Sequence, residues 1–418
     1  MEIKKFSPVF ILVCMLFVNC AGKKKQPTVS FDEAKQQIKS NKPFVFKHPG
    51  ILNSENQIDF VRKKIELEQE PWKSAFEKLK KSRYASPSYN AKPYQIVNCG
   101  SYNKPNVGCD AQAEDGMAVY CNALLYCFTK EEKYAKKALS IIDAWANTYE
   151  KNTSSNSRLL VSWTAPWIAN GAELLRYEYP DWQKENENQV NKLFDKFLPY
   201  VMDETMPGNN WIQSAIEANF AIAVFKDDKP LFDKAVERWK FRVKTYIYES
   251  SDGPTPIKTP GKSDEQMKDI WRQNAQSTAY IDGLAMESCR DLGHLNLGFS
   301  SMIYAAETAY QQNVDLFALE KKRLTDFMEL HGSWMTGAVK VPANICDGFI
   351  ITKNGNKKGI EPPVGGGESA WEIAYNQLHD RLKIPLPYTK KMIEDKRPTG
   401  IYKWVAKGET LTHAGRVF

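Results

Sequence analysis

Apolar residues recur at three- and four-residue intervals along most of the chain, which is the pattern of helices that bury one face. Alternating apolar and polar runs, which would indicate strands, are nearly absent apart from residues 349–352. The chain is therefore predicted to be all-α. The predicted helices cover residues 54–83, 113–128, 131–149, 159–178, 184–205, 209–225, 228–248, 266–287, 289–312, 314–336 and 367–383.

Short turns join most of these helices, and they contain residues that break a helix, as at Pro207-Gly208. Helices joined by short turns pack as antiparallel neighbours, so we expect stacked helix pairs. An α/α toroid, an incomplete barrel of such pairs with little β structure, is our first choice of fold. An α-solenoid is the second. Two longer loops, at 251–264 and 337–366, have the length of cleft walls or lids.

The N-terminus has the features of an export signal. Lys4 and Lys5 precede an apolar run at 8–18 that is too short for a stable membrane anchor. The run ends at Cys20, which resembles the lipid-modified cysteine of a bacterial lipoprotein. Because Asn19 is unusual before such a cysteine, an ordinary cleaved signal is the alternative. Either way, the protein is expected to be exported, into the periplasm or onto the outer membrane through a lipid on Cys20.

We therefore expect three parts along the chain: a signal peptide at 1–20, a linker and N-terminal segment at 21–50, and one α/α-toroid domain at 51–418. Export implies an oxidising compartment, in which disulfides persist.

The cysteines favour structural roles over metal binding. Cys99 and Cys109 flank a loop rich in Gly, Asn and Pro, and they could close a small disulfide. The others lie in an apolar helical run or look isolated: Cys121, Cys127, Cys289 and Cys346. With no Cys-x-x-Cys pair and only 5 His, the sequence gives little support for a zinc cluster, and we expect neither a metal nor a cofactor.

Composition excludes several classes of protein. Of 418 residues, 42% are hydrophobic and 12% aromatic, which is too apolar for a disordered chain. The net charge of +7, from 57 basic and 50 acidic residues, is spread along the chain and argues against a nucleic-acid partner. The surplus of aromatic rings suits sugar stacking as well as core packing. Trp163 and Trp167, four residues apart, form a stripe of this ambiguous kind.

The densest polar cluster is the segment 287–294, Glu-Ser-Cys-Arg-Asp-Leu-Gly-His. Arg290 and His294 are four residues apart and share one helix face. A guanidinium binds a carboxylate through two hydrogen bonds, and an imidazole transfers protons, so the pair suits an anionic substrate. The alternative is that Arg290 pairs with Glu287, or Asp291 with His294, in a network that only ties helices together.

A second cluster, Asn209-Asn210-Trp211, stands at a predicted helix start. Helix capping explains one Asn, whereas two Asn and a Trp exceed what a cap needs. The N-terminus of a helix is also a natural site for an anion.

A third cluster lies at 371–381. There Tyr375 and His379 share a helix face, and Arg381 points away from it. Core packing is the default interpretation of Tyr375.

Taken together, these segments resemble the alginate lyase domain family of helical-toroid polysaccharide lyases. The Glu-x-x-Arg-Asp-x-x-His segment at 287–294 is the most specific part of the resemblance, which extends from about residue 95 to the C-terminus. The supporting segments are 99–109, 114–120, 142–145, 209–211, 372–376, 397–398 and 409–413.

The resemblance implies β-elimination at a uronic acid of an acidic polysaccharide such as alginate or glucuronan. Such an enzyme neutralises the carboxylate, removes the C5 proton and protonates the departing O4. By position, Asn210 and Arg290 match the neutralising pair, and His294 is our choice for base or neutraliser. A Tyr should serve as the acid, or as acid and base together. Substrate binding is assigned to Asn209, Trp211, Trp163, Trp167, His379 and Arg381.

The sequence departs from the family pattern at three positions. Trp211 stands where a His follows the neutralising Asn, and Leu297 stands where the catalytic Tyr would lie. Gln377 replaces a His of the third cluster. Tyr280 and Tyr375 are the best substitutes for the missing Tyr. Tyr304 is the third.

Two other functions are kept open. A surface lipoprotein that binds glycans would need aromatic platforms but no Arg, His and Asn constellation. An inverting glycoside hydrolase on the same fold would need two carboxylates about 6.5–9.5 Å apart, and Asp115, Glu287 and Asp291 are available for it.

Overall fold

The computed structural model describes residues 44–347, 370–398, 400–405 and 408–416. From Phe46 onward, these belong to one compact unit. The predicted signal peptide with Cys20 and the short apolar run at 349–352 lie outside the described residues. Within the described ranges, no helix combines the length and the apolar character that crossing a bilayer requires.

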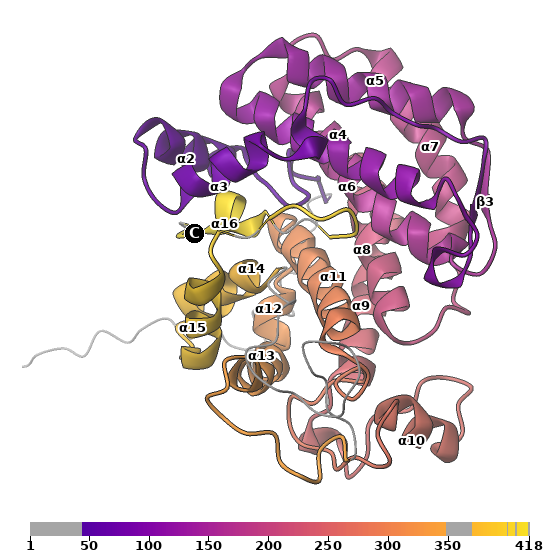
Figure 1. Cartoon of the computed structure of the whole chain (residues 1–418), viewed down its shortest axis with the longest axis vertical. Coiled ribbons are helices and arrows are strands. Elements are labelled where there is room, and N and C mark those ends of the chain that lie inside the picture. The colour runs from indigo at the N-terminus through magenta and orange to yellow at the C-terminus, as the bar shows by residue number, and fades with distance from the viewer. Residues whose placement is uncertain (1–43, 348–369, 399, 406–407, 417–418) are drawn as a thin grey trace, which may run out of the picture. The chain divides into compact units, whose positions relative to one another are not determined.

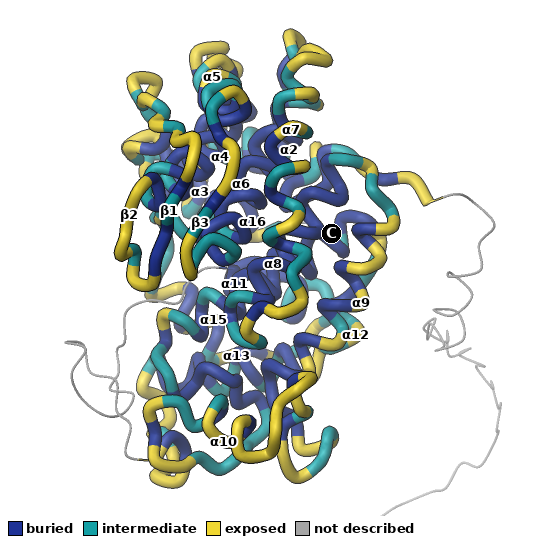
Figure 2. Tube along the Cα trace, turned by 90° about the vertical axis from the view of Figure 1, so that its right-hand side faces the viewer, coloured by how far each residue is buried: buried dark blue, intermediate teal, exposed yellow. Residues whose placement is uncertain are grey.

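Four long helices form an inner row: α4 (Cys109–Thr129), α6 (Ser157–Glu178), α8 (Asn210–Phe225) and α11 (Leu292–Gln311). Each packs against the next in this order. Their sequences are apolar around most of the circumference, so they bury nearly every side chain rather than one stripe. Figure 2 shows them as the dark, buried centre of the molecule. The inner row therefore supplies the core.

A second row covers the first: α5 (Glu132–Thr148), α7 (Lys184–Val201) and α9 (Lys229–Tyr246). These helices follow α4, α6 and α8 in the chain, and each packs on the helix that precedes it. They are amphipathic, burying residues such as Ile141 and Trp145 on one face while Lys and Glu side chains stay in solvent. Alternation of inner and outer helices is the pattern of an α/α toroid.

C-terminal helices close the packing order. The short α14 (Trp371–Tyr375) packs on α11, and α16 (Glu409–His413) packs on α14, α2 (Glu55–Glu66) and α3 (Trp72–Lys80). Since α2 in turn contacts α4, the order of contacts returns to its start. Figure 1 shows α16 beside α2 and α3. The predicted toroid is thus confirmed over the alternative solenoid, whose two ends would not meet.

The remaining helices are short or peripheral: η1 (Arg83–Ala85), η2 (Ser101–Asn103), η3 (Ser250–Asp252), α10 (Asp264–Arg272), α12 (Leu316–Leu319), α13 (Lys321–Met335), the π-helical turn η4 (Asn376–Arg381) and α15 (Pro387–Lys396). A small sheet has the order β2-β1-β3, with β1 (Ile96–Cys99), β2 (Asn106–Val107) and β3 (Lys151–Thr153). β1 pairs with β2 antiparallel, Asn98 opposite Val107, and with β3 parallel, Val97 opposite Asn152. The Cys99–Cys109 disulfide, as expected from the sequence, joins this sheet to the start of α4.

Three helix predictions were wrong in extent, one of them 314–336, which is divided at Glu320 into α12 and α13. The predicted helix 54–83 is divided, because α2 ends at Glu66 and the chain turns before Pro71, the residue that precedes α3. The predicted helix 266–287 ends at Arg272, where Gln273 adopts φ 48°. The residues after it hydrogen-bond to a distant segment instead, as Gln276 N–H does to the Asp347 carbonyl (2.9 Å) and Ala279 N–H to the Asn344 carbonyl (2.9 Å). Tertiary pairing therefore replaces a helix that periodicity alone favoured.

Candidate active site

The first turn of α8 meets the segment before α11 at a buried carboxylate. Asn209 caps α8, accepting a hydrogen bond from Trp211 N–H (3.2 Å). Asn210, fully buried, donates its backbone N–H and its side-chain Nδ2 to the two oxygens of Glu287 (2.9 Å each). The Oδ1 atom of Asn210 is buried without a hydrogen-bond partner. Asn210 and the segment 287–294, 77 residues apart, are thus brought together as the sequence predicted.

Glu287 is the centre of this network. Its side chain is fully buried, and it also accepts from Arg290 Nη1 (2.9 Å) and from the Tyr246 hydroxyl (3.1 Å). Burial, followed by the charge of Glu287, raises the pKa of Tyr246 well above its usual value, so the phenol remains a neutral donor. A buried carboxylate with this many donors, one of them a guanidinium, is electrostatically satisfied. Its role is to fix Arg290 and the start of α8.

The start of α11 carries an Asp–His pair. Asp291 is the N-cap and accepts from the backbone N–H of His294 (2.8 Å), while its other oxygen lies 2.6 Å from His294 Nδ1. Burial opposes ionisation of Asp291, yet the hydrogen bonds and charge of His294, with the charge of Arg290, hold its pKa below the usual value. An ionised Asp291 accepts the Nδ1 proton, which leaves Nε2 as the acceptor of the imidazole.

Arg290, Asp291 and His294 are the partly exposed members of the cluster. Their side chains are 25%, 37% and 34% exposed, against 0% for Glu287. Arg290 Nε lies 3.9 Å from Asp291 Oδ2, too far for a good hydrogen bond. Both interactions that the structural alternative named, Arg290 with Glu287 and Asp291 with His294, are present. They leave guanidinium donors and an imidazole nitrogen at the surface, where a ligand can reach them.

A disulfide and a buried histidine hold the segment 287–294 in place. Cys289 is bonded to Cys346, which corrects the expectation that these two cysteines are isolated. Their pairing joins the residue before Arg290 to the loop that follows α13. Ser288 Oγ lies 2.9 Å from Nε2 of His331 on α13, whose Nδ1 donates to the Phe327 carbonyl (2.8 Å). Burial lowers the pKa of His331 to about 4, so this imidazole stays neutral.

The tyrosines proposed from the sequence make their contacts outside the Arg290–His294 cluster. The ring of Tyr280 packs against Trp271 and Tyr248 (centroids 5.8 and 5.5 Å), and burial followed by the neighbouring phenol of Tyr248 raises its pKa. Tyr375 stacks on His379 (4.7 Å), as their spacing predicted, and burial raises its pKa to about 12. Among the described residues, neither has a hydrogen bond or ring contact with Asn210, Arg290 or His294.

Tyr304, the third choice, is buried and donates to Glu409. The tyrosine that does join the cluster is Tyr246, at the last position of α9. Sequence reasoning missed it because nothing around it is unusual. Its contact with Glu287 arises from the packing of α9 on α11.

Three of the residues expected to bind substrate are half-buried: Asn209, Trp211 and Trp163. Asn209 and Trp211 stand half-buried in the first turn of α8, beside the cluster. The ring of Trp163 is half-buried and packs on Trp404 (5.1 Å).

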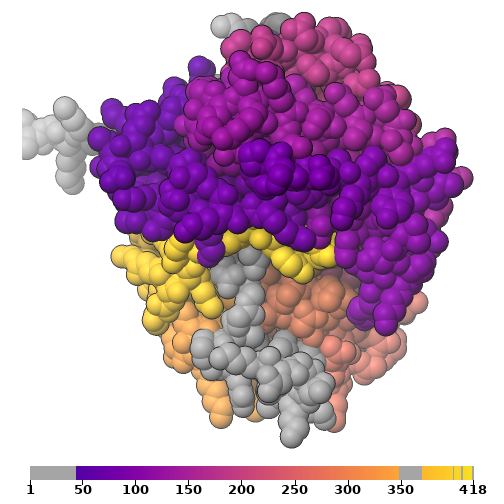
Figure 3. Space-filling model, turned by 45° about the horizontal axis from the view of Figure 1, so that its top comes forward, coloured from indigo at the N-terminus to yellow at the C-terminus, as the bar shows by residue number. Residues whose placement is uncertain are grey.

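Figure 3 shows the C-terminal segment, in yellow, along the edge of the indigo and violet N-terminal half. Its Lys403 pairs with Asp110 of α4 (2.6 Å).

Trp167 and Arg381 require correction as substrate-binding residues. Trp167 is 2% exposed, its ring packed between Tyr120 and Tyr304 (5.5 and 5.4 Å), so a sugar cannot reach it. Arg381 holds Asp315 with both terminal nitrogens (2.7 and 2.9 Å) and donates Nε to a glutamine, which leaves few donors for a ligand. His379, two residues before Arg381, has its Nδ1 2.9 Å from the backbone carbonyl oxygen of Ile384. This third cluster supports the fold.

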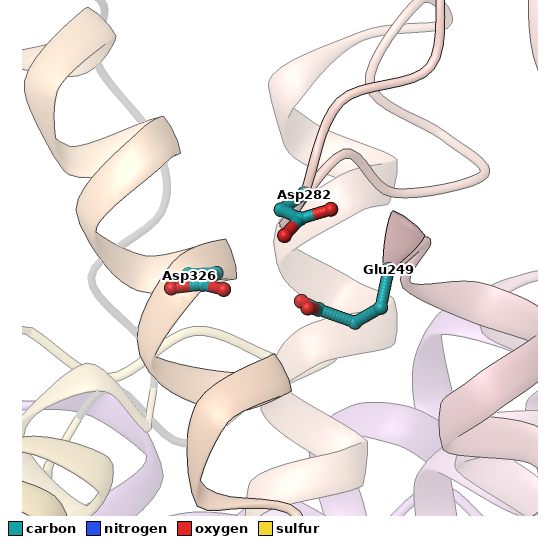
Figure 4. Close-up of side chains that lie close together, drawn as sticks. All are labelled: Glu249, Asp282 and Asp326. Carbon is teal, nitrogen blue, oxygen red and sulfur yellow. The ribbon is translucent and has the colours of Figure 1, made fainter. Parts of the chain in front are cut away.

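One further group has the ligand chemistry of a cation site. Glu249, Asp282 and Asp326 converge from three parts of the chain (Figure 4). Lys322 pairs with all three, at 2.9 Å from Asp282 and 2.5 Å from Asp326. Hydrogen bonds from Lys322 and then from Ser250 N–H lower the pKa of Asp282 to about 2. An ammonium thus occupies the position that a metal ion would take.

Comparison with known proteins agrees with this geometry. A family model described as alginate lyase matches residues 61–257, a range that includes the start of α8 and ends before Arg290. No curated protein sequence matches the chain.

Solved structures share the fold. A Tyr-to-Phe variant of alginate lyase A1-III, complexed with a tetrasaccharide, is 14% identical, with a TM-score of 0.56 over 89% of this chain and 100% of that one. An alginate lyase from Bacteroides ovatus is 11% identical, with a TM-score of 0.54 over 88% of this chain and 99% of that one. At such low identity these likenesses concern the α/α toroid. The sequence match to the alginate lyase family model is limited to residues 61–257, just under half of the chain, so the similarity to that family is shown over this part of the sequence.

Proposed function

We propose that this protein cleaves a uronate polymer by β-elimination at Arg290 and His294. The observation that carries the proposal is the Asp291–His294 hydrogen bond of 2.6 Å directly beside a partly exposed Arg290. It combines an oriented base with a cation at the start of an inner helix. The similarity to alginate lyases supplies the reaction class, and the substrate is alginate or another polyuronate such as glucuronan.

Arg290 neutralises the substrate carboxylate. Glu287 accepts from Nη1 and thereby fixes the plane of the guanidinium, so its remaining N–H groups are directed before substrate arrives. The charge that develops on the carboxylate as C5 loses its proton is stabilised by these donors. Asn210, fully buried and bonded to Glu287, acts as a positioning residue, a role different from the direct neutraliser expected from the sequence.

His294 moves the proton. Its Nδ1–H is held by Asp291, and Nε2 accepts the C5 proton. The electron pair of the C5–H bond forms the C4–C5 double bond, and the bond from C4 to O4 breaks. The imidazolium then returns the proton from Nε2 to O4, so the residue ends in its initial state. Tyr246 donates its hydroxyl to Glu287 and does not serve as the acid in this scheme.

Two half-buried tryptophans are suited to contact sugar rings. Trp211 adjoins the cluster, and Trp163 with Trp404 forms a tilted pair on the α4–α6 side. Aromatic faces against sugar rings add apolar contact without competing for the carboxylates. The tetrasaccharide bound to the A1-III variant is consistent with a site that spans several sugars.

A panel of polyuronates tests the proposal. Incubation with polymannuronate, polyguluronate or glucuronan should raise ultraviolet absorbance as the unsaturated sugar forms. Arg290→Ala should remove most of this signal, whereas Arg272→Ala should leave it intact, because Arg272 is partly exposed and its ion pair among the described residues is with Asp269. Folded protein without absorbance change on every polyuronate would refute the proposal.

The same assay separates the two alternatives. A glycan binder would retain oligosaccharide without any new absorbance. A hydrolase would release reducing sugar without an unsaturated product. The structure gives the hydrolase little support, since Asp115 already accepts from Tyr89 and Trp145 (2.6 Å each) and Glu287 is saturated by its donors.

We further propose that the protein is an exported lipoprotein anchored through Cys20. Support comes from the sequence alone, from the apolar run that ends at that residue. Expression in a bacterial host should place the protein in the membrane fraction, and Cys20→Ser should release it. A wild-type protein found only in the soluble periplasmic fraction would contradict the anchor.

A further inference from the structure

A guanidinium without an anion lies near the start of α8. Arg242 on α9 is 7% exposed, and its Nη1 is buried without a hydrogen-bond partner. Among the described residues, it forms no ion pair, and its nearest aromatic contact is Phe241 (5.3 Å). Burial lowers the pKa of Arg242, and Glu204 opposes that shift only from a distance. Glu204 is instead within 3.2 Å of Arg238 and 3.8 Å of Lys234. A buried, unpaired cation is costly, so a compensating anion is expected.

A second unpartnered group faces the same point. A Cβ added to Gly208 would lie 3.2 Å from Thr259 Oγ1 and 3.8 Å from Arg242 Nη1. Thr259 is 8% exposed, and its hydroxyl is buried without a partner. Three separate parts of the chain therefore converge: the turn before α8, the segment after η3, and α9. Because Gly208 has no side chain, Thr259 and Arg242 can lie this close to the turn before α8.

The environment is made of donors. The guanidinium and hydroxyl stand beside the N-terminus of a helix of 16 residues, whose dipole favours negative charge. Asn210, the residue that holds Glu287, follows Gly208 by two positions. Thr259 lies in a segment bounded by Gly253 and Gly261, both at positive φ, where no other atom lies within 4 Å of an added Cβ.

We propose that Arg242, Thr259 and Gly208 form a second anion subsite that takes a carboxylate-type anion next to the Arg290–His294 cluster. This inference rests on the proposed function for its natural ligand, the carboxylate of a neighbouring uronate in the bound chain. A free small anion such as acetate or chloride offers the same charge, and the experiment distinguishes the two sources.

Thermal unfolding of the full chain provides the first readout. Wild type, Arg242→Met and Thr259→Val are melted alone, with sodium acetate or chloride, and with a tetramannuronate at matched ionic strength. Without ligand, Arg242→Met should melt at a higher temperature than wild type, because it removes an unpaired buried charge. The tetramannuronate should stabilise wild type, and both substitutions should weaken that binding, Arg242→Met by about tenfold or more.

Kinetics on a cleavable polyuronate provide the second readout. Arg242→Met should raise KM by about tenfold with kcat within about twofold, because the subsite binds substrate and transition state alike. Arg272→Met, at a partly exposed arginine, is the matched control. Thr259→Val changes no charge and keeps the test decisive if Arg242→Met does not fold.

Equal ligand-induced shifts and equal KM in wild type and both variants would overturn the subsite. Stabilisation by acetate or chloride but not by tetramannuronate would overturn the uronate as its ligand. Since binding is measured by melting, these outcomes remain separate from a failure of the protein to cleave any polymer.

Discussion

Two charged clusters in this protein differ in how far their polar groups are satisfied. Around Lys322, one ammonium pairs with three carboxylates, so its three N–H donors all have acceptors. Around Glu287, the carboxylate is the buried member, and its donors come from Asn210, Tyr246 and Arg290. There Arg290 and His294, which are partly exposed together with Asp291, keep donors and an acceptor that the described residues do not use.

The difference separates a structural cluster from a reactive one. A cluster in which each polar group satisfies another fixes the chain and offers nothing to a ligand. In the other kind of cluster, the central group has its hydrogen bonds and the outer groups do not. The outer groups are then held in place and are still available to a ligand. Charge density alone, which both clusters share, would not distinguish them.

Loss of His294 should give the largest effect. His294→Gln keeps size and polarity but removes the base, and turnover on a polyuronate should fall by about 10²- to 10⁴-fold. His379→Gln, in the third cluster, should retain turnover because that imidazole is bonded to a backbone carbonyl. Initial rates of absorbance increase measure both. Equal losses would place the reactive histidine elsewhere or show that both act.

Loss of the Cys289–Cys346 disulfide beside the Glu287 cluster should give the second-largest effect. Replacing Cys289 and Cys346 by Ser should lower the free energy of unfolding by about 4 kcal/mol, given a separation of 57 residues. Turnover should fall as well, because Cys289 precedes Arg290.

The Cys99–Cys109 pair provides a matched control. It closes only 10 residues and should cost about 3 kcal/mol when replaced by Ser, with no change in turnover. Denaturant titration and initial rates measure the two effects. If the Cys289 and Cys346 double variant kept full turnover while folded, the disulfide would not position the active segment.

His331, which supports Ser288 from α13, should make stability depend on pH. Its pKa is lowered to about 4 in the folded protein, so the unfolded chain takes up a proton first as the pH falls. The contribution of neutral His331 to the free energy of unfolding is complete above about pH 6.5. It should decline by about 3 kcal/mol as the pH falls through 4. Urea titrations of wild type and His331→Gln over this range measure the difference. An identical slope in both would contradict the assignment.

Lys322→Met should give the smallest effect on turnover. Lys322 is 62% exposed, but its partner Glu249 is 2% exposed, so its loss should lower the free energy of unfolding by more than the ~1 kcal/mol of a surface ion pair. Turnover should not change. With the ammonium removed, Ca²⁺ should raise the melting temperature of the variant but not of wild type, because the three carboxylates then lack a cation. A Ca²⁺ shift in wild type would mean that Lys322 does not close this cluster.

Periodicity located the inner helices well because they are long and their ends are marked. The predicted 209–225 corresponds to α8, and the predicted 159–178 to α6. It failed at 266–287, where the chain beyond Arg272 pairs with residues 344–347 instead of coiling on itself. A local pattern carries no information about a partner that lies about seventy residues further along the chain.

The site was predictable to the same degree. The sequence placed Arg290 and His294 in one segment, but the helix face they were expected to share was wrong, because α11 begins at Leu292 and Arg290 lies before its N-cap, Asp291. Tyr246, Arg242 and the Cys289–Cys346 bond were not predictable, because each acts across elements that only packing brings together.

The sequence by itself determined the helical class of this protein, the inner and outer helices, and the residues of the Glu-x-x-Arg-Asp-x-x-His segment. These follow from local periodicity and from residue chemistry. Only the tertiary structure decided which polar groups are satisfied and which remain open. That distinction depends on burial and on partners far apart in the chain, as where Glu287 joins α8 to α11 and leaves Arg290 and His294 at the surface.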